Sequence, residues 1–173
     1  NSPTQRVGGS ITKSFKSSSH RYPMYSLSNT YTKDEIIKWE ERILKILGND
    51  ITISFSCELK FDGASINLTY KEGELVKALT RGDGLTGDEI TENIKTIKTI
   101  PLRLKGEYPK FFEVRGEIIL PIKDFNKMNM RRAELGEALY SNPRNTASGS
   151  LKLQDSSQVA RRPLKCFIYS VVG

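Results

Sequence analysis

Apolar residues recur at every second position over several short stretches of this chain. The alternation marks residues 51–59, 64–71, 74–81, 111–120 and 164–172. A period of two predicts β-strands with one buried face, because successive side chains point to opposite sides of a strand. Strands of parallel sheets are buried on both faces and read as continuous apolar runs, so alternation favours antiparallel sheets.

Helical patterns separate these stretches. Thr32 and Glu35 form a capping-box signature ahead of apolar residues at helical spacing, and Gly48 can close that helix. Pro121 can open a second helix, which we expect to run to about residue 135. A polar loop over 141–150 leads into a short third helix. The fold class is therefore α+β, with mainly antiparallel sheets flanked by helices.

The N-terminal part has a different character. Residues 1–31 are rich in Ser, Thr, Gly and Tyr and show no sustained period. We predict an N-terminal arm or linker over 1–31, packed on a domain over 32–173. The chain has no initiator methionine and no apolar signal core, which indicates a piece of a longer, cytoplasmic protein. Its 173 residues contain no apolar run of the ~20 residues that a membrane span needs.

The net charge and the two cysteines indicate which partners and metal sites the chain can have. The net charge of +7 favours polyanionic partners, nucleic acid among them. Cys57 and Cys166 are far apart and form no Cys-x-x-Cys pair, so we expect two reduced core thiols and no zinc site. The single histidine, His20, is expected at the surface or in a turn, and no site made by protein ligands alone is expected for a metal.

A lysine, a carboxylate and a glycine stand between the first two predicted strands. Lys60 and Asp62 are two residues apart and share a face on extended backbone, and Gly63 lets a ligand approach closely. Free lysine has a pKa near 10.4, so about one in a thousand is neutral at pH 7. Burial or nearby positive charge can make a lysine nucleophilic. The alternative is a solvated lysine paired with Glu58 or Asp62.

A glycine-rich segment follows the second hairpin strand. Gly82, Gly84 and Gly87 fit the G-x-G-x-x-G spacing of a dinucleotide-binding loop, which would imply a parallel Rossmann sheet and an oxidoreductase. The alternating strands argue against that sheet. We therefore expect a loop that can approach a phosphate, with Arg81 at its head.

Two other segments carry charges in informative places. Glu113, Arg115 and Glu117 share one face of the predicted strand 111–120, which indicates either a polar cleft floor or a solvated face with Arg115 paired to a neighbouring glutamate. Arg144 lies among small residues near a helix start, which suits phosphate binding or an ordinary capped loop.

In this order the segments resemble the adenylation domain of bacterial NAD-dependent DNA ligases. The matching residues are 2–8 (SPTQRVG), 23–29 (PMYSLSN), 58–63 (ELKFDG), 80–84 (TRGDG), 92–93 (EN), 113–117 (EVRGE) and 142–145 (NPRN). The resemblance spans nearly the whole chain. It implies a nucleotidyltransferase fold, the ATP-grasp-like fold of DNA ligases and capping enzymes, with the nucleotide cleft between sheets.

The resemblance also implies a reaction. Lys60 would attack NAD, release nicotinamide mononucleotide and hold AMP as lysyl-AMP, and the AMP would then activate the 5′-phosphate of nicked double-stranded DNA for sealing in repair and replication. Asp62 would be a second catalytic residue, and magnesium would accompany the substrate. The implied nucleotide contacts are Ser26, Leu27, Glu58, Arg81 and Glu117, and the implied contacts to nucleic acid or phosphate are Arg144 and Lys152.

Some family features are absent from this sequence. The family usually has an arginine where Lys152 stands, and lysine lacks the bidentate geometry of arginine. The subdomain that grips nicotinamide mononucleotide and the later adenylation motifs are not in the chain. We expect 32–173 to be a partial adenylation domain, a monomer that alone adenylates itself weakly or not at all and seals no nicks.

Other functions remain open on sequence alone. An ATP-dependent nucleotidyltransferase of the ligase or capping type would share the Lys-x-Asp-Gly motif. A Rossmann oxidoreductase and a non-catalytic basic nucleic-acid-binding module are further alternatives. The first would use ATP as AMP donor, the second would have a parallel sheet, and the third would bind DNA in a salt-sensitive way without a nucleotide pocket.

Overall fold

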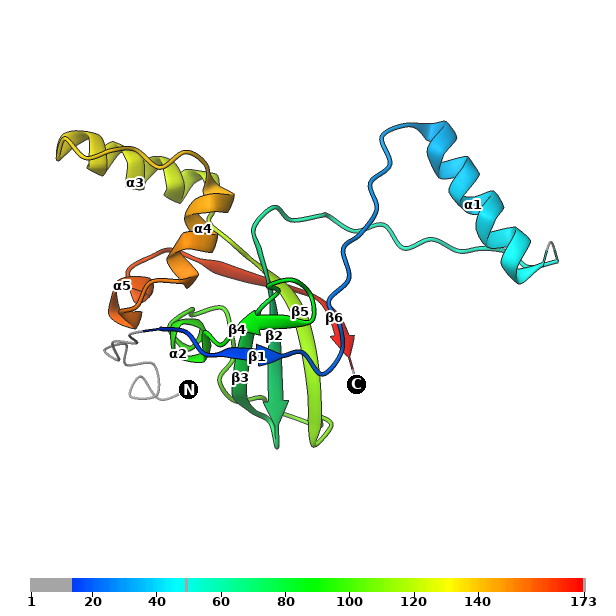
Figure 1. Cartoon of the computed structure of the whole chain (residues 1–173), viewed down its shortest axis with the longest axis horizontal. Coiled ribbons are helices and arrows are strands. Elements are labelled where there is room, and N and C mark those ends of the chain that lie inside the picture. The colour runs from blue at the N-terminus through cyan, green and yellow to red at the C-terminus, as the bar shows by residue number, and fades with distance from the viewer. Residues whose placement is uncertain (1–13, 49, 173) are drawn as a thin grey trace. The chain divides into compact units, whose positions relative to one another are not determined.

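The computed structural model describes residues 14–48 and 50–172 (Figure 1). They divide into two compact units, each described here by itself. Unit 1 comprises Asn1–Met24 and Phe61–Gly173, and unit 2 is Tyr25–Lys60. The matching segment 2–8 and the first part of the expected arm lie outside the described residues, and the expected boundary after residue 31 stays a prediction.

A four-stranded sheet is the centre of unit 1. Its order is β3-β2-β5-β6, with strands β3 (Glu74–Thr80), β2 (Ala64–Lys71), β5 (Phe111–Ile119) and β6 (Lys165–Val172). All three pairings are antiparallel. Four of the five predicted strands are therefore confirmed. The parallel sheet of the Rossmann alternative is wrong for the part of the chain that the structure describes.

The remaining elements of unit 1 are short. Strands β1 (Ser17–Ser19) and β4 (Thr86–Asp88) pair antiparallel in a second, two-stranded sheet. The helices are α2 (Thr91–Lys95), α3 (Ile122–Glu134), α4 (Pro143–Leu151) and α5 (Ser156–Ala160). Pro121 stands at the N-cap of α3 as predicted. Asn142 caps α4 by accepting a 2.7 Å hydrogen bond from the Asn145 backbone.

The two faces of the four-stranded sheet differ in chemistry. On one face the alternating apolar side chains of β2 and β5 are buried against helices α2, α4 and α5. This core includes Ile66, Leu68, Ile94, Ile118, Ala147, Leu151 and Val159. Asn93 connects helix α2 to the end of α4, because its side-chain amide donates 2.8 Å hydrogen bonds to the carbonyls of Leu151 and Leu153. The opposite face carries polar side chains and is the candidate site.

Unit 2 contains the first predicted helix, α1 (Lys33–Leu47). Thr32 and Glu35 make both bonds of the capping box. Backbone N–H groups of Tyr31 and Thr32 lower the pKa of the Glu35 carboxyl by donating hydrogen bonds to it. Trp39 lies 5.4 Å from Phe55, centroid to centroid. Among the described residues, no helix is both long enough and apolar enough to cross a bilayer.

Four sequence expectations are corrected. Residues 143–150 belong to helix α4 rather than to a polar loop, because Asn142 caps a helix that already begins at Pro143. Residues 51–59 form no strand, since a strand needs a hydrogen-bonded neighbour and the structure pairs none with this described segment. Cys57 is consequently exposed, whereas Cys166 is partly buried and burial raises its pKa to about 12, with the Glu117 charge adding to the shift. His20 is buried rather than at the surface, and its Nε2 lies 3.1 Å from the Arg81 carbonyl oxygen.

Candidate active site

The polar face of the sheet consists of cross-strand pairs between β2 and β5. Ser65 lies opposite Glu117, Asn67 opposite Arg115, and Thr69 opposite Glu113. Alternation forces this result, because the same two strands point their apolar residues into the core. The three charges predicted on one face of 111–120 therefore lie in a row.

Glu113 shows that this row is not simply a solvated face. Glu113 is only 5% exposed, and its carboxylate accepts hydrogen bonds from Asn67 Nδ2 at 2.9 Å and from Thr69 Oγ1 at 3.2 Å. A buried carboxylate without such donors would be costly. Glu113 is thus a structural anchor beneath the more open part of the face.

Arg115 binds the segment 20–24 to the sheet through hydrogen bonds. Its Nη2 donates to the carbonyl oxygens of Tyr22 at 3.0 Å and Pro23 at 2.9 Å. The expected alternative for Arg115 was pairing with a neighbouring glutamate, but its recorded bonds go to these backbone oxygens. The guanidinium positions residues 20–24 beside the site.

Glu117 is the most open carboxylate of the row. One oxygen accepts a 3.2 Å bond from the Gly63 backbone N–H, and the other accepts a 2.7 Å bond from Ser65 Oγ. A carboxylate offers about four acceptor positions, so these two bonds leave each oxygen able to accept another donor. The Gly63 bond ties the end of the Lys-x-Asp-Gly motif to the sheet face.

Tyr169 is the residue that sequence reasoning missed. It lies on β6, hydrogen-bonds with Ser65, and its pKa is raised mainly by burial, with a smaller contribution from the Glu117 charge. The charges of Arg115 and Arg81 act on it in the opposite direction, so all of these groups surround one aromatic ring. The β6 register shifts opposite Arg115 and Gly116, and strict alternation could not have revealed this irregularity.

A second aromatic contact lies close by in the sequence. Phe61 and Phe167 stack with ring centroids 4.1 Å apart and planes 15° from parallel. Phe61 is the variable position of the Lys-x-Asp-Gly motif. Its ring therefore anchors the motif's second residue on β6.

Two predicted phosphate-contacting residues lie at the two ends of helix α4, Arg144 in its first turn and Lys152 at its C-cap, and both form ion pairs. Arg144 Nη1 lies 3.1 Å from Asp62 Oδ1, and Lys152 Nζ lies 2.7 Å from Asp88 Oδ2. The side chains of Asp62 and Arg144 are mostly exposed, and exposed pairs contribute only about 0–1 kcal/mol to stability. Such pairs can exchange their carboxylates for a ligand's phosphates at small cost.

The other predicted site residues belong to unit 2. Ser26, Leu27, Glu58 and Lys60 are exposed on segments without regular secondary structure. Lys60 directly precedes Phe61, the first residue of the second part of unit 1. The roles of these residues stay predictions.

The glycine-rich segment is a turn held by an aspartate. Asp83 Oδ1 accepts bonds from the backbone N–H groups of Leu85 at 2.9 Å and Thr86 at 2.7 Å. Gly84 has a φ of 95°, which favours glycine, and the Met24 carbonyl oxygen occupies the space that a side chain would need. The glycines thus admit residues 20–24 and leave Arg81 at the edge of the polar face.

Acid is expected to loosen this turn. Bonds from Thr86 and Leu85 lower the pKa of the Asp83 carboxyl below its usual value of 3.8. A depressed folded-state pKa means that the stabilisation is present above the unfolded value and lost as pH falls through the folded one. We expect the Leu85 and Thr86 amide resonances to titrate together below pH 3.8 in NMR spectra. The same resonances should stay flat in Asp83→Asn, and flat resonances in the unmodified protein would contradict the assignment.

The described residues were also searched for clusters of side chains that could bind a metal ion. Within 14–48 and 50–172, no group of three or more His, Cys, Asp or Glu residues is placed to hold an ion.

Comparison with known proteins finds a matching family and several relatives. The sequence profile of the NAD-dependent DNA ligase adenylation domain matches residues 12–173. A protein named DNA ligase from Flavobacterium johnsoniae is 63% identical over 172 residues, covering 99% of this chain and 26% of its own length. DNA ligases from Cytophaga hutchinsonii and Bacteroides fragilis are 54% and 50% identical, covering 99% and 100% of this chain and 25% and 26% of their own lengths.

The chain thus spans about a quarter of the length of the curated relatives it matches. Since the profile covers nearly all of it, the chain belongs to the family of NAD-dependent DNA ligase adenylation domains.

Proposed function

We propose that this chain carries the nucleophile and much of the adenosine pocket for AMP transfer from NAD, on a nucleotidyltransferase fold of the ligase and capping-enzyme type. The neutral Nζ of Lys60 attacks the α-phosphorus of NAD and forms a P–N bond. The bond from that phosphorus to the bridging oxygen breaks, and nicotinamide mononucleotide leaves with the electron pair. The lysine gives up a proton, which leaves a phosphoramidate.

The observation that carries this proposal is the hydrogen bond from Gly63 N–H to Glu117. It joins the Lys-x-Asp-Gly motif to a carboxylate with acceptor positions to spare. The two hydroxyls of a ribose suit such a carboxylate. We therefore assign Glu117 to the ribose and Lys60 to the phosphorus.

The aromatic and basic groups around Glu117 suit the rest of an adenylate. Tyr169 is partly exposed beside Glu117, which suits stacking of a base, and Arg81 supplies positive charge at the edge of the same face. Glu58, Ser26 and Leu27 are proposed to border the adenine. A side chain that donates a hydrogen bond to the edge of the base, or accepts one from it, would distinguish adenine from other bases.

Asp62 is proposed to position Lys60 through its charge. Its exposed carboxylate is a suitable oxygen donor for Mg²⁺ brought in by the NAD phosphates, although it alone is no metal site. Such an ion would offset negative charge on the phosphates during the transfer. Arg144 would then be free to bind phosphate.

Later steps involve DNA and the whole protein. AMP passes from lysine to the 5′-phosphate at a nick, and the 3′-hydroxyl displaces it as the strands join. Arg144 and Lys152 are proposed to contact DNA phosphates, exchanging Asp62 and Asp88 for them. Nicked duplex DNA is therefore the proposed macromolecular partner.

Comparison of AMP donors tests the proposal. The whole protein that contains this chain is incubated with Mg²⁺ and either NAD or ATP, and its intact mass is measured. We expect a gain of one AMP with NAD and none with ATP. A gain with ATP alone would replace this function by an ATP-dependent nucleotidyltransferase, and no gain with either donor would remove it.

Loss of the Tyr169 ring should weaken nucleotide binding. Stacking of a base on an aromatic side chain is worth about 1–3 kcal/mol, so Tyr169→Ala is expected to weaken AMP binding about 5- to 150-fold by isothermal titration calorimetry. Tyr169→Phe keeps the ring and should bind within about threefold of the unmodified protein. Equal affinities for the alanine variant and the unmodified protein would place the base elsewhere.

A further inference from the structure

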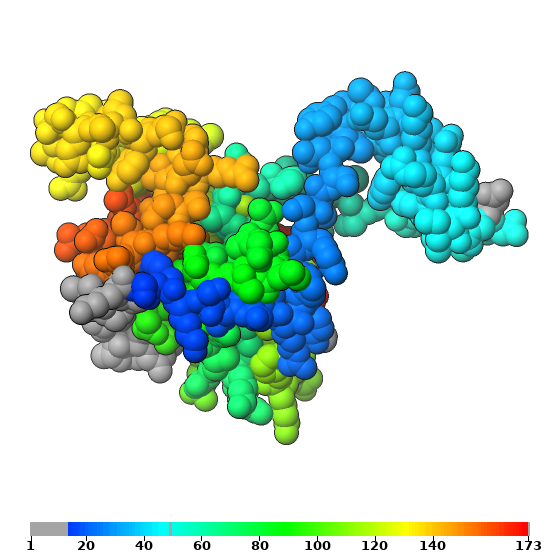
Figure 2. Space-filling model, viewed as in Figure 1, coloured from blue at the N-terminus to red at the C-terminus, as the bar shows by residue number. Residues whose placement is uncertain are grey.

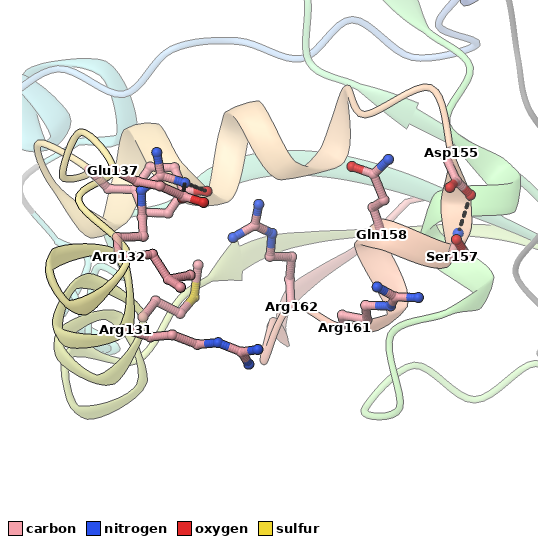
Figure 3. Close-up of a pocket in the computed structure, with 11 residues that line it drawn as sticks. Arg131, Arg132, Glu137, Asp155, Ser157, Gln158, Arg161 and Arg162 are labelled. Carbon is pink, nitrogen blue, oxygen red and sulfur yellow. Dashed lines mark hydrogen bonds and ion pairs between the residues drawn. The ribbon is translucent and has the colours of Figure 1, made fainter.

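A cavity separate from the polar sheet face is lined by four arginines. It measures about 540 Å³ and lies between α3, the segment that follows α3, and α5 (Figure 3). The arginines are Arg131, Arg132, Arg161 and Arg162, and the acidic residues at its wall are Glu137 and Asp155. We call these four arginines with their cavity the arginine cleft.

Both carboxylates of the cleft are already engaged. Glu137 lies 2.8 Å from Arg132 Nη1, and Asp155 accepts a 2.8 Å bond from the Ser157 backbone at the start of α5. Among the described residues, Arg131 and Arg162 form no ion pair with a carboxylate, whereas the charge of Arg161 acts on the Asp155 carboxylate and helps to lower its pKa. The cleft therefore holds a net positive charge that its own acidic groups do not neutralise.

Two of the guanidinium groups are held in place by one aromatic ring. The carbon of the Arg132 guanidinium lies 4.4 Å from the Tyr140 ring centroid, and that of Arg162 lies 5.3 Å from it. Asn129 fixes Tyr140 in turn, since it donates to the Tyr140 carbonyl at 3.1 Å and accepts from the Tyr140 N–H at 2.9 Å. Stacked arginines lose less conformational entropy when they bind an anion.

The positions of the arginines in the cleft indicate which anion it can bind. Arg131 reaches in from α3, while Arg161 and Arg162 come from the end of α5, so the charges lie on separate elements (Figure 3). Arginine suits bidentate contact with phosphate oxygens. A row of charges from two elements suits several phosphates of one strand better than one small anion.

The cleft also adjoins elements assigned to DNA. Helix α4, which carries Arg144 in its first turn and is followed by Lys152, lies between α3 and α5 along the chain, and all three form one continuous surface of unit 1 (Figure 2). We propose that the arginine cleft binds the phosphate backbone of duplex DNA outside the nick. This inference rests on the proposed function, because it assumes that DNA is the substrate.

Salt-dependent DNA binding by the whole protein tests the inference. The probe is a labelled duplex with a single nick and a dideoxy 3′ end, which cannot be sealed, and anisotropy is measured over a range of salt concentrations. Removing three phosphate contacts should lower the slope of log K against log salt by about 2–3, at about 0.9 per contact. For the variant Arg131→Gln, Arg161→Gln, Arg162→Gln, we expect at least about tenfold weaker binding at about 0.1 M salt.

A matched control removes the same charge elsewhere. The variant Lys98→Gln, Arg103→Gln, Lys105→Gln changes exposed residues in the segment before β5. It should bind the probe within about threefold of the unmodified protein. The pair Arg131→Gln, Arg161→Gln leaves both arginines on Tyr140 intact, so it keeps the test valid if the triple variant unfolds in circular dichroism.

Three outcomes would overturn the inference. One is unchanged DNA binding by the folded cleft variants, and another is an equal loss in the control variant, which would indicate bulk charge alone. The third is loss of binding to polyglutamate with unchanged DNA binding, which would assign the cleft to an acidic protein segment. AMP transfer from NAD to the unmodified protein is measured alongside, so failure of the proposed function is seen separately.

Discussion

Replacing Lys60 with alanine is expected to abolish AMP transfer from NAD to the protein, by about a thousandfold or more, because a covalent intermediate cannot form without its nucleophile. Lys60→Arg should be equally inactive, since a guanidinium keeps the charge but stays protonated. Single-turnover assays with NAD labelled in the adenylate measure the rate directly.

The control for this prediction is a lysine with no assigned role. Lys71 is exposed at the end of β2, and Lys71→Ala should transfer AMP at the rate of the unmodified protein. Calorimetry with AMP should show that Lys60→Ala is folded and still binds the nucleotide. AMP transfer by Lys60→Ala at an undiminished rate would mean that another residue is the nucleophile.

The second large effect is expected at Gly63, which closes the lysine motif. A Cβ built there lies 2.1 Å from the Ile118 carbonyl oxygen, far inside the closest real contacts. Ile118 is fully buried, so its backbone has little room to move. We expect Gly63→Ala to lower the free energy of unfolding by about 3 kcal/mol and to slow AMP transfer by disturbing the Gly63–Glu117 bond.

A glycine-to-alanine substitution in a helix with open space around it should instead raise the free energy of unfolding. Gly149 lies within helix α4, and a Cβ there meets no atom within 4 Å. Alanine favours helix over glycine by about 1 kcal/mol, so Gly149→Ala is expected to stabilise by about that amount. Urea denaturation of both variants compares them, and equal midpoints would contradict the steric account of Gly63.

Much of the fold could be predicted because alternation and capping are local signals. The hairpin of β2 and β3, the central strand β5 and the capped helix α1 all follow from short-range patterns. Residues 51–59 show the same alternation yet form no strand, because pairing depends on a neighbour that a local pattern cannot supply. The glycine spacing of 82–87 was likewise explained only by the fold, because backbone oxygens of Thr86, Met24 and Thr80 occupy the space that side chains at Gly82, Gly84 and Gly87 would need.

The candidate site was predictable in part for a similar reason. Register follows from alternation, so the row of Glu113, Arg115 and Glu117 could be placed on one face. Tyr169 could not, because an irregularity in the β5–β6 pairing decides where its ring points. His20 could not either, because its burial depends on a contact with the distant Arg81 backbone.

Crystals of the whole protein grown with NAD provide the most direct measurement. We predict continuous electron density from Lys60 Nζ to the phosphorus of AMP, with the ribose hydroxyls on Glu117 and the base against Tyr169. AMP bound covalently to any other side chain, or an adenosine remote from Glu117, would contradict the assignment of Lys60 and of this sheet face.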